Sequence, residues 1–521
     1  MIKAFFISII FLFNLSLAAV ELKRGNRIEP ESLDPHKILG VYEGQIIYDL
    51  FEGLVAYGPK GEVLPALAER WEISEDGTVY TFYLKNALWS NGEDITAYDV
   101  VYSFERLLMP STASPSAFVL YPIKNAQEMN SGRSKELSPL GVKALARNII
   151  EITLTNPMSY FLDILAHRAA VILHKKSLLA NPNTWTSPDK IVTNGAYILK
   201  EWKSLNSIKI VKNPYYWDKE NVFIDNVFYF PIEDKKQEWQ RFKTGDLHIT
   251  SDVPNEYVEI ARKDFAKAYR ESPSLLFYFL SFNMEHPTFK KYPKIRQALS
   301  MVVDREKFVQ TVTKSSEKPA YTVIPKGIKS YESEKVDFQD LPFNQRVKEA
   351  QKLYEECGFS KDEPLKLELI YNSDTVHKRN LVAIAAMWKE HLGIETDLKE
   401  MEWKVYLQKR NAGDFMIARS SWIGDYPHPS TFLEIFRSTA SAQNPSKYKN
   451  PKFDNLLDKA LRSETEPVIF GIFKEAEKTL LDDFPIIPLY HGNNRNLVDP
   501  KLKGFEDNLL GIHRSKYLKF E

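Results

Sequence analysis

A short segment of the chain, residues 418–432, contains an arginine and an aspartate separated by uncharged residues. These two residues are Arg419 and Asp425. If residues 419–424 are extended, alternate side chains face opposite ways and the backbone can pair with another extended chain. The segment could then hold a zwitterionic peptide, with a carboxylate for its amino group and a guanidinium for its carboxyl group. A buried ion pair beside a turn explains these residues equally well.

Signatures of catalysis and of metal binding are missing from the sequence. It has no H-E-x-x-H, G-x-S-x-G or C-x-x-C motif, and its 10 histidines show no pairing at the spacing of metal ligands. We therefore assign no catalytic residue and expect neither a metal nor another cofactor. A secreted hydrolase acting on peptides or cell-wall fragments remains the alternative from another functional class.

Length and charge restrict the class of protein. The chain has 521 residues, more than the roughly 250 to 300 at which a single core stops growing, so two or three domains are expected. Lys plus Arg and Asp plus Glu both number 69, which excludes the strong positive field of a typical nucleic-acid binder. A neutral or zwitterionic ligand fits this balance better.

The amino-terminal segment has the features of a secretory signal peptide. Lys3 precedes a mostly apolar run from Ala4 to Phe13, and Ser16 and Ala18 are spaced for cleavage after Ala18. No later stretch approaches the ~20 apolar residues of a membrane span. There is no cysteine near the cleavage site for a lipid anchor. We expect an exported, unanchored protein of the periplasm, with residues 1–18 removed.

Local patterns predict elements along the whole chain. In the first half they indicate a helix over 42–51, a hairpin within 63–84 with its turn at Asp76-Gly77, and a helix that begins with a capping box at Thr96. In the second half helical and strand patterns alternate, which is typical of an α/β domain. The predicted helices are 295–312, 344–357, 376–391 and 453–461, and the predicted strands are 365–371, 394–398 and 486–490.

Several longer motifs occur in a fixed order after the signal peptide. They are Ser32-Leu33-Asp34-Pro35-His36-Lys37, Asp49-Leu50-Phe51-Glu52-Gly53-Leu54, Thr193-Asn194-Gly195-Ala196-Tyr197, Asn213-Pro214-Tyr215-Tyr216-Trp217, Ala298-Leu299-Ser300 with Asp304-Arg305, and the segment 418–432. Together they closely resemble the periplasmic oligopeptide-binding proteins of the peptide/nickel solute-binding family, which serve ABC importers. The resemblance covers essentially the whole mature chain.

This resemblance implies a two-lobed α/β periplasmic-binding-protein fold with an additional third domain and a ligand cleft between the lobes. The implied first lobe is discontinuous and consists of residues 19–51, 177–274 and 492–521. The extra domain would be 52–176 and the other lobe 275–491. Hinge closure about two crossovers would bury a peptide as an added strand. A monomer is expected.

The resemblance also assigns roles to residues of the cleft. Asp425 matches the carboxylate that binds the peptide amino group, whereas Arg419, Arg410 and His377 match positions that hold ligand carboxylates. Trp403 matches an aromatic lining position. The backbone contacts would come from Gly40 and Val41 on one side and from Ser421, Trp422 and Ile423 on the other. Two assignments have structural alternatives: a core tryptophan for Trp403 and a solvated helix-start histidine for His377.

Some positions depart from the well-known members of the family. Leu39 stands where a pocket carboxylate occurs, Thr311 and Thr313 where a lysine holds the ligand carboxylate, Ser116 where a tyrosine is expected, and Ile423 where a cysteine occurs. Recognition of the amino terminus is unaffected. The preferred length and side chains of the ligand therefore stay open, and carboxylate binding could shift to the remaining cations.

The expected function is thus capture of short peptides and their transfer to an inner-membrane ABC permease, without chemistry. A murein peptide is the alternative ligand within the binding class, and the leucine at position 39 favours it. Nickel or haem binding also occurs in the wider family, but the segment around Asp425 favours peptides.

Overall fold

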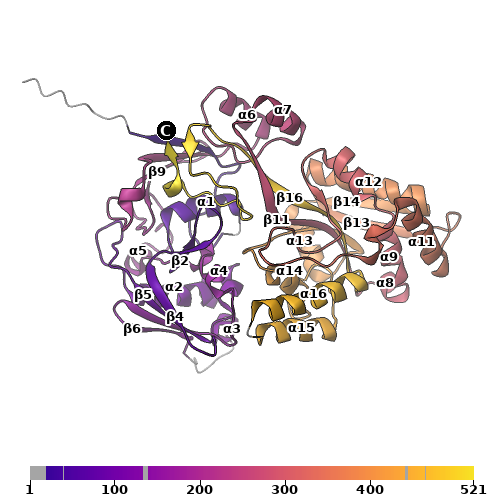
Figure 1. The fold of residues 1–521 in the computed structure, drawn as a ribbon, viewed down its shortest axis with the longest axis horizontal. Coiled ribbons are helices and arrows are strands. Elements are labelled where there is room, and N and C mark those ends of the chain that lie inside the picture. The colour runs from indigo at the N-terminus through magenta and orange to yellow at the C-terminus, as the bar shows by residue number, and fades with distance from the viewer. Residues whose placement is uncertain (1–18, 39, 133–138, 441–443, 464) are drawn as a thin grey trace, which may run out of the picture.

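The structure is a computed structural model that describes residues 19–38, 40–132, 139–440, 444–463 and 465–521. The predicted signal peptide and Leu39 lie outside these ranges. Figure 1 shows two bodies of unequal composition side by side, joined by two long strands that cross between them. The predicted mixed α/β architecture is confirmed, and we call the body on the right in Figure 1, with its core between Leu275 and Tyr490, the large lobe.

A six-stranded sheet forms the centre of the large lobe. In spatial order its strands are β12 (Lys318–Pro319), β16 (Ile486–Leu497), β11 (Tyr269–Phe282), β15 (Ile417–Ile423), β13 (Lys366–Asn372) and β14 (Glu395–Met401). The pairings are antiparallel from β12 to β15, and parallel where β13 meets β15 and β14. The three strands predicted in this half are confirmed, and β16 is longer than expected.

Helices surround this sheet. They are α8 (Pro287–Lys291), α9 (Lys294–Met301), α10 (Arg305–Phe308), α11 (Phe343–Glu356), α12 (Thr375–Leu392), α13 (Trp403–Ala412), α14 (Ser430–Leu433), α15 (Pro451–Leu461) and α16 (Glu466–Asp483). The predictions for α11, α12 and α15 are confirmed. The predicted helix 295–312 is wrong in one respect: it stops at Met301 and restarts at Arg305, because the Asp304 side chain accepts the Lys307 N–H and caps a new helix.

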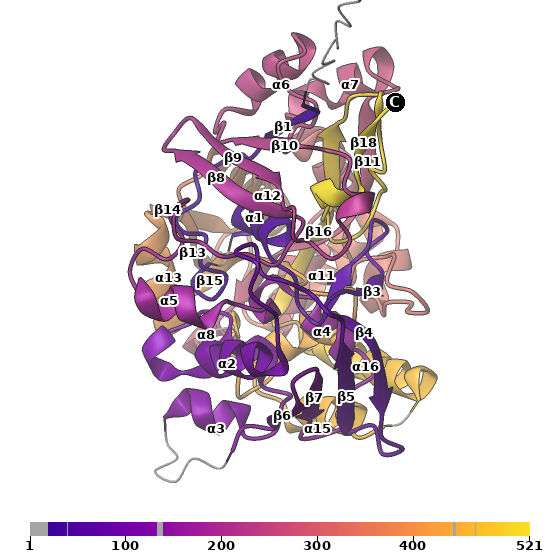
Figure 2. The same ribbon diagram turned by 90° about the vertical axis from the view of Figure 1, so that its left-hand side faces the viewer.

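The other body contains two four-stranded sheets with separate cores, and two sheets of two strands. One sheet has the order β1 (Glu21–Gly25), β10 (Asn226–Phe230), β9 (Ser207–Lys212) and β8 (Tyr197–Lys203). This sheet packs against α1 (Val41–Leu50). Helices α6 (Lys235–Lys243) and α7 (Val258–Asp264) lie nearby, and β17 (Leu502–Lys503) and β18 (Lys519–Phe520) end the chain. We call this part the terminal lobe; Figure 2 shows it above the other four-stranded sheet.

The remaining part, which we call the accessory unit, has a core formed by residues between Tyr48 and Ile172, together with Ile512. Its strands are β2 (Val55–Tyr57), β3 (Val63–Pro65), β4 (Ala68–Ile73), β5 (Val79–Leu84), β6 (Val142–Ala146) and β7 (Ile149–Thr153), and its helices are α2 (Ala97–Leu108), α3 (Ala126–Ser131), α4 (Phe161–Leu165) and α5 (Lys175–Ala180). The predicted hairpin is β4 and β5, with Gly77 at φ 69° in its turn. The predicted capping box between Thr96 and Asp99 is present at the start of α2.

Two long strands, β11 and β16, connect the lobes. They pair from Tyr269 to Ser281, but the ladder shifts register between Pro273 and Phe277. A side chain at Gly492 would not fit there, because its Cβ would lie 2.6 Å from a methyl group of Leu276. The ladder is therefore irregular at the point where the two strands pass between the lobes.

Candidate functional site

The segment between Arg419 and Asp425 has one open backbone edge. The extended conformation that the peptide hypothesis requires is present: the segment forms β15, which pairs with β11 from Ile417 to Ile423. On its other side β15 pairs with β13 only at Ile417 and Ala418. Among the described residues, no strand covers that edge beyond Ala418. The open edge could accept an added strand.

The loop after β15 holds Asp425 in place. The Gly424 N–H donates to the carbonyl of Leu275 at 3.0 Å, and the Asp425 N–H donates to Thr431 Oγ1 at 3.1 Å. The Asp425 side chain is 19% exposed, and its Oδ1 lies 3.7 Å from His167 Nε2. Within the described ranges no group donates a hydrogen bond to this carboxylate. Asp425 is therefore a mostly buried acid with unused acceptor capacity, not half of an ion pair with Arg419.

His167 comes from the accessory unit and was not predicted. Its Nδ1 accepts the Ala169 N–H at 3.3 Å, so the ring proton belongs on Nε2, which faces Asp425. Burial, and then the neighbouring Arg168, holds the pKa of His167 well below its usual value, so the ring is neutral. No local pattern in the sequence around His167, which follows α4 (Phe161–Leu165), indicates that the fold brings it to Asp425.

The surroundings of Asp425 make its ionisation sensitive to mildly acidic pH. Burial raises its pKa to about 6, although the Arg168 guanidinium opposes the shift. Tyr48, Tyr57 and Tyr426 also face it, and their hydroxyls do not ionise at this pH. An ammonium ligand stabilises the carboxylate form, so binding it below pH 6 must displace a proton.

We therefore expect affinity for a ligand ammonium group to fall by up to about tenfold per pH unit below pH 6. Titration calorimetry at pH 5, 6 and 7 measures this, and His377, with a pKa lowered to about 4, does not titrate in that range. Asp425→Asn supplies the control, because its affinity should not change with pH. An equally steep pH dependence in that variant would assign the titration to another group.

The Arg419 guanidinium is nearly buried and has only neutral partners. Its Nη1 donates to Asn372 Oδ1 at 3.3 Å and its Nη2 to Ser421 Oγ at 3.2 Å. Its Cζ lies 5.1 Å from the centroid of the Tyr278 ring, and Nε has no hydrogen-bond partner. A buried cation without a carboxylate partner is suited to an anionic ligand group.

His377 lies close to this guanidinium but is not charged. Its Nδ1 is 3.2 Å from the Tyr278 hydroxyl. Burial, and then the charge of Arg419, lowers its pKa to about 4. It begins α12, as the structural alternative held, yet its side chain is only 16% exposed. His377 can hydrogen-bond a carboxylate at neutral pH but cannot neutralise it.

Trp403 and Arg410 both lie on α13, beside β15. The Tyr406 hydroxyl on the same helix donates to the Arg419 carbonyl, which joins α13 to the strand. Trp403 is 48% exposed and its ring packs on Tyr406, so the alternative of a core tryptophan is wrong. Arg410 donates to Asn411 at 3.4 Å, and the structure shows no contact between Arg410 and Arg419.

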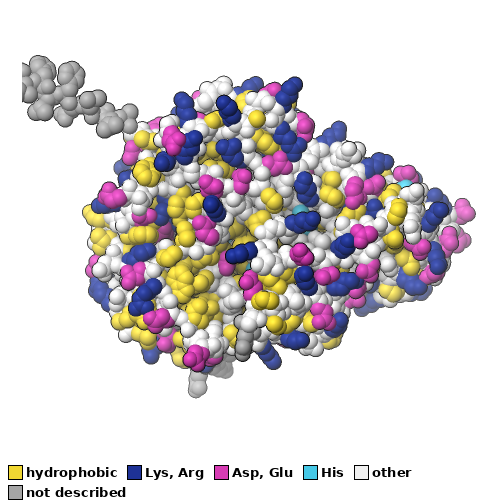
Figure 3. Space-filling model, in the orientation of Figure 1, with side chains coloured by type: hydrophobic (Ala, Val, Ile, Leu, Met, Phe, Trp, Pro, Cys, Tyr) yellow, Lys and Arg dark blue, Asp and Glu magenta, His cyan; other side chains and the backbone are white. Residues whose placement is uncertain are grey.

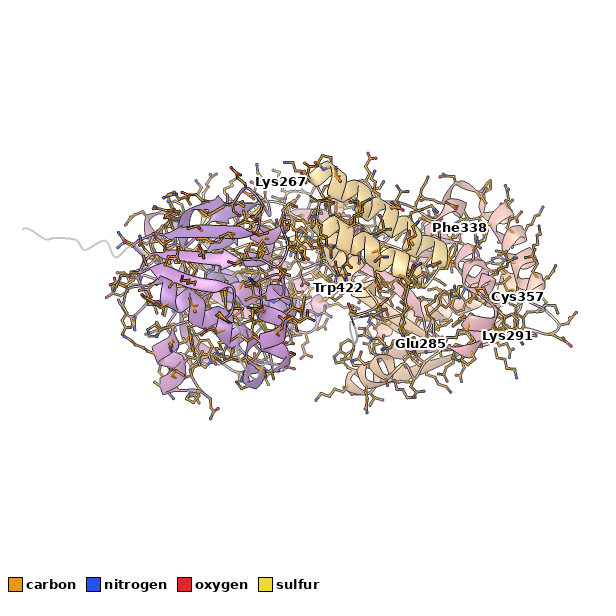
Figure 4. All side chains as sticks on the ribbon, turned by 90° about the horizontal axis from the view of Figure 1, so that it is seen from below. Lys267, Glu285, Lys291, Phe338, Cys357 and Trp422 are labelled. Atoms are coloured by element: carbon orange, nitrogen blue, oxygen red, sulfur yellow. The ribbon has the colours of Figure 1, made fainter. Side chains whose placement is uncertain are left out.

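The remaining predicted residues line the two sides where the lobes meet. Gly40 is extended and precedes α1, and Val41 is 41% exposed. On β15 Ile423 is 50% exposed, and the indole N–H of Trp422 is buried without an acceptor. Figure 4 shows Trp422 where the two bodies approach each other.

The lobes are in contact in this structure. Asn255 of the terminal lobe donates to the carbonyl of Thr313 at 3.0 Å. The Tyr160 ring of the accessory unit stacks on Tyr426 and His428 of the large lobe, with centroid distances of 5.5 and 3.9 Å. These contacts, together with that between His167 and Asp425, correspond to a closed arrangement.

The positions that depart from the resemblance supply no cation. The Thr313 side chain is buried and donates to the Val309 carbonyl, while Thr311 donates to the Lys307 carbonyl. Ser116 is buried. None of these three side chains could neutralise a ligand carboxylate, so binding of that group would depend on Arg419.

Other kinds of site find no support in the part of the chain that the structure describes. No group of three His, Cys, Asp or Glu side chains there could hold a metal ion. No helix of the described ranges is long and apolar enough to cross a membrane. Figure 3 shows acidic and basic side chains interspersed over one face of the molecule, consistent with the neutral composition.

Comparisons with known proteins give consistent results. Residues 62–444 match the family model of bacterial extracellular solute-binding proteins, family 5. The chain is 36% identical over 492 residues to the periplasmic murein peptide-binding protein MppA of Escherichia coli, covering 94% of this chain and 90% of the relative. It is 37% identical over 491 residues to the periplasmic oligopeptide-binding protein OppA of Salmonella typhimurium, covering 93% and 89%. The solved structure of the E. coli murein tripeptide binding protein MppA superposes with a TM-score of 0.86 at 34% identity, covering 96% of this chain and 98% of that one.

Proposed function

The chain belongs to the bacterial extracellular solute-binding proteins of family 5, and from this premise we propose that it captures short peptides and delivers them to an inner-membrane ABC permease. The observation that supports this most is the open edge of β15, which runs from a buried guanidinium at Arg419 to a buried carboxylate at Asp425. Each terminal charge of a peptide would find an unpaired opposite charge, and its backbone would find a free strand edge.

In this proposal the peptide amino group lies against Asp425, with His167 closing over it from the accessory unit. The peptide backbone pairs with Ser421, Trp422 and Ile423 on one side and faces Gly40 and Val41 on the other. Its carboxylate lies near Arg419, and His377 and Arg410 are the further groups that would hold the carboxylates of ligands of other lengths. Trp403 packs against a ligand side chain.

Closure would follow the division of the chain expected from the resemblance. We place the hinge at the bulge between β11 and β16, near residues 274 and 492. In this division the discontinuous lobe is 19–51, 177–274 and 492–521, the extra domain 52–176 and the other lobe 275–491. It is supported by the three largest cores, each of which draws most of its residues from one of these parts. A ligand that contacts both faces favours the closed state.

We further propose that the protein acts as a monomer in the periplasm, exported by a cleaved signal peptide and not lipid-anchored, and that it catalyses no reaction. A murein peptide is a second candidate ligand. The chain is about as similar to a murein peptide-binding protein, at 36% identity over 94% of the chain, as to an oligopeptide-binding protein, at 37% over 93%.

Ligands that co-purify with the protein test this function. Protein isolated from the periplasm under native conditions, then denatured and analysed by mass spectrometry, should release intact short peptides in near-stoichiometric amount. Peptides containing diaminopimelate would identify the murein alternative. Cleavage of added peptides by the purified protein would instead support the hydrolase and contradict the proposal.

A further inference from the structure

Asn255 joins the terminal lobe to the large lobe through the amide of its side chain. Its Nδ2 donates to the carbonyl of Thr313 in the large lobe at 3.0 Å, and its Oδ1 accepts from Arg495 Nη1 at 3.1 Å. A hydrogen bond between two lobes holds only while their surfaces are together. The bond from Asn255 to Thr313 therefore belongs to the closed arrangement, whereas the bond from Arg495 stays within the terminal lobe.

The acceptor of the bond between the lobes is a carbonyl at the end of a helix. Residues Val309–Thr313 form a π-helical turn, and Lys314 ends it in the left-handed conformation with φ 51°. The last carbonyls of a helix have no partner within the helix. Asn255 supplies a donor to the Thr313 carbonyl when the lobes are closed, and water would have to supply it when they are open.

The terminal lobe fixes the donor in position. Pro254 leads into the short 3₁₀ turn Asn255–Tyr257, and the Tyr257 ring packs against the buried Trp239 with centroids 5.0 Å apart. The guanidinium of Arg495 can only donate, so the amide oxygen must face it. The amide NH₂ group is thereby directed at the large lobe, and little freedom is lost when it bonds there.

Electrostatic attraction acts between the same two surfaces. Glu256 follows Asn255 in the turn, and Arg379 lies on α12 of the large lobe. A hydrogen bond from its own backbone N–H, then Lys236 and Arg379, lowers the pKa of Glu256, while burial opposes the shift. The Glu256 carboxylate pairs directly with Lys236 at 3.2 Å, so Arg379 acts on it from farther away. The charges favour approach of the lobes, and the amide provides the directional contact.

We propose that Asn255 is a positioning residue that locks the lobes in their closed arrangement, with the same effect on every bound peptide. A bond made only in the closed state shifts the equilibrium towards that state. Since the peptide is held between closed lobes, loss of this bond weakens the binding of all peptides by one common factor. The inference rests on the proposed function and concerns a residue outside the predicted peptide contacts.

Two substitutions separate the bond to Thr313 from the bond to Arg495. Asn255→Ala removes both bonds. Asn255→Asp keeps an oxygen for the guanidinium but turns a second oxygen, which cannot donate, towards the Thr313 carbonyl. Calorimetric titrations with trialanine and tetraalanine should show affinities about fivefold lower in Asn255→Ala and at least fivefold lower in Asn255→Asp. The factor should be the same for both peptides, and stopped-flow measurements should find it in the dissociation rate.

Asn221→Ala is the control variant, because Asn221 is exposed in the terminal lobe and its amide donates to Asp218 of the same lobe. It should bind both peptides as the unaltered protein does. Unchanged affinity in a folded Asn255→Asp variant overturns the inference and leaves peptide binding intact. Unequal losses for the two peptides also overturn it, because they would place Asn255 in contact with the ligand. Absence of binding of both peptides by the unaltered protein overturns the proposed function itself.

Discussion

Asp425→Asn should weaken the binding of free-amino peptides by at least about 2 kcal/mol, or roughly 30-fold. The reason is that an amide cannot neutralise the ligand ammonium group, which would be buried between the lobes. The same substitution should leave the ligand-free protein as stable as before or more stable at pH 7. Burial raises the pKa of Asp425 to about 6, which means that its ionised form is disfavoured in the fold without a ligand.

Calorimetry and thermal unfolding of the same preparation measure both effects. Asp397→Asn is a suitable control, since its side chain is 61% exposed on the same lobe and should change neither quantity. Unchanged peptide affinity in a folded Asp425→Asn variant would remove Asp425 from the site.

Glu52→Gln should destabilise the fold by about 3 kcal/mol, the lower end of the cost of breaking a buried charge pair. Glu52 is buried and accepts hydrogen bonds from Arg514 at 2.7 Å, Tyr216 at 2.6 Å and Trp217 at 2.9 Å. Burial alone would raise its pKa, but Lys516, Arg514 and these hydrogen bonds lower it to about 2. This stabilisation is present above about pH 4.5 and is lost as the pH falls towards 2.

Urea denaturation of the ligand-free protein checks this prediction. Glu72→Gln is the matched control, because Glu72 pairs with Arg70 at the surface, where solvent screens the pair and its contribution to stability is small. A Glu52→Gln variant as stable as the Glu72→Gln variant would show that the buried network does not stabilise the fold.

Periodic patterns predicted the fold well where one element decides its own structure. The helix α12 and the strand β13 follow from apolar spacing, and the break after Met301 was missed because it depends on one capping side chain, Asp304. Helix α13 was also not predicted. Its apolar residues do not form a stripe, and it is held in place by tertiary contacts such as that from Tyr406 to the Arg419 carbonyl.

The candidate site was predicted only in part for the same reason. The charges of Arg419 and Asp425 and the extended segment between them are local features of the sequence. His167, Tyr278 and Tyr490 join them through the packing of separate units, which no local pattern specifies.

Burial also changes what some predicted residues can do. His377 was expected to help hold a carboxylate, and in the folded protein it remains neutral near pH 7. Asp425 was considered as half of an ion pair with Arg419, yet its carboxylate faces the neutral His167 ring at 3.7 Å. Such shifts depend on desolvation, which requires the three-dimensional structure.

The central claim is that the protein recognises a peptide by its free amino terminus at Asp425. Calorimetric titration of one tripeptide that co-purifies with the protein, in its free and its N-acetylated forms, tests this claim most directly. Acetylation removes the ammonium charge and leaves the buried carboxylate without its partner. We expect the free form to bind at least roughly 30-fold more tightly. Equal affinity of the two forms would contradict the account.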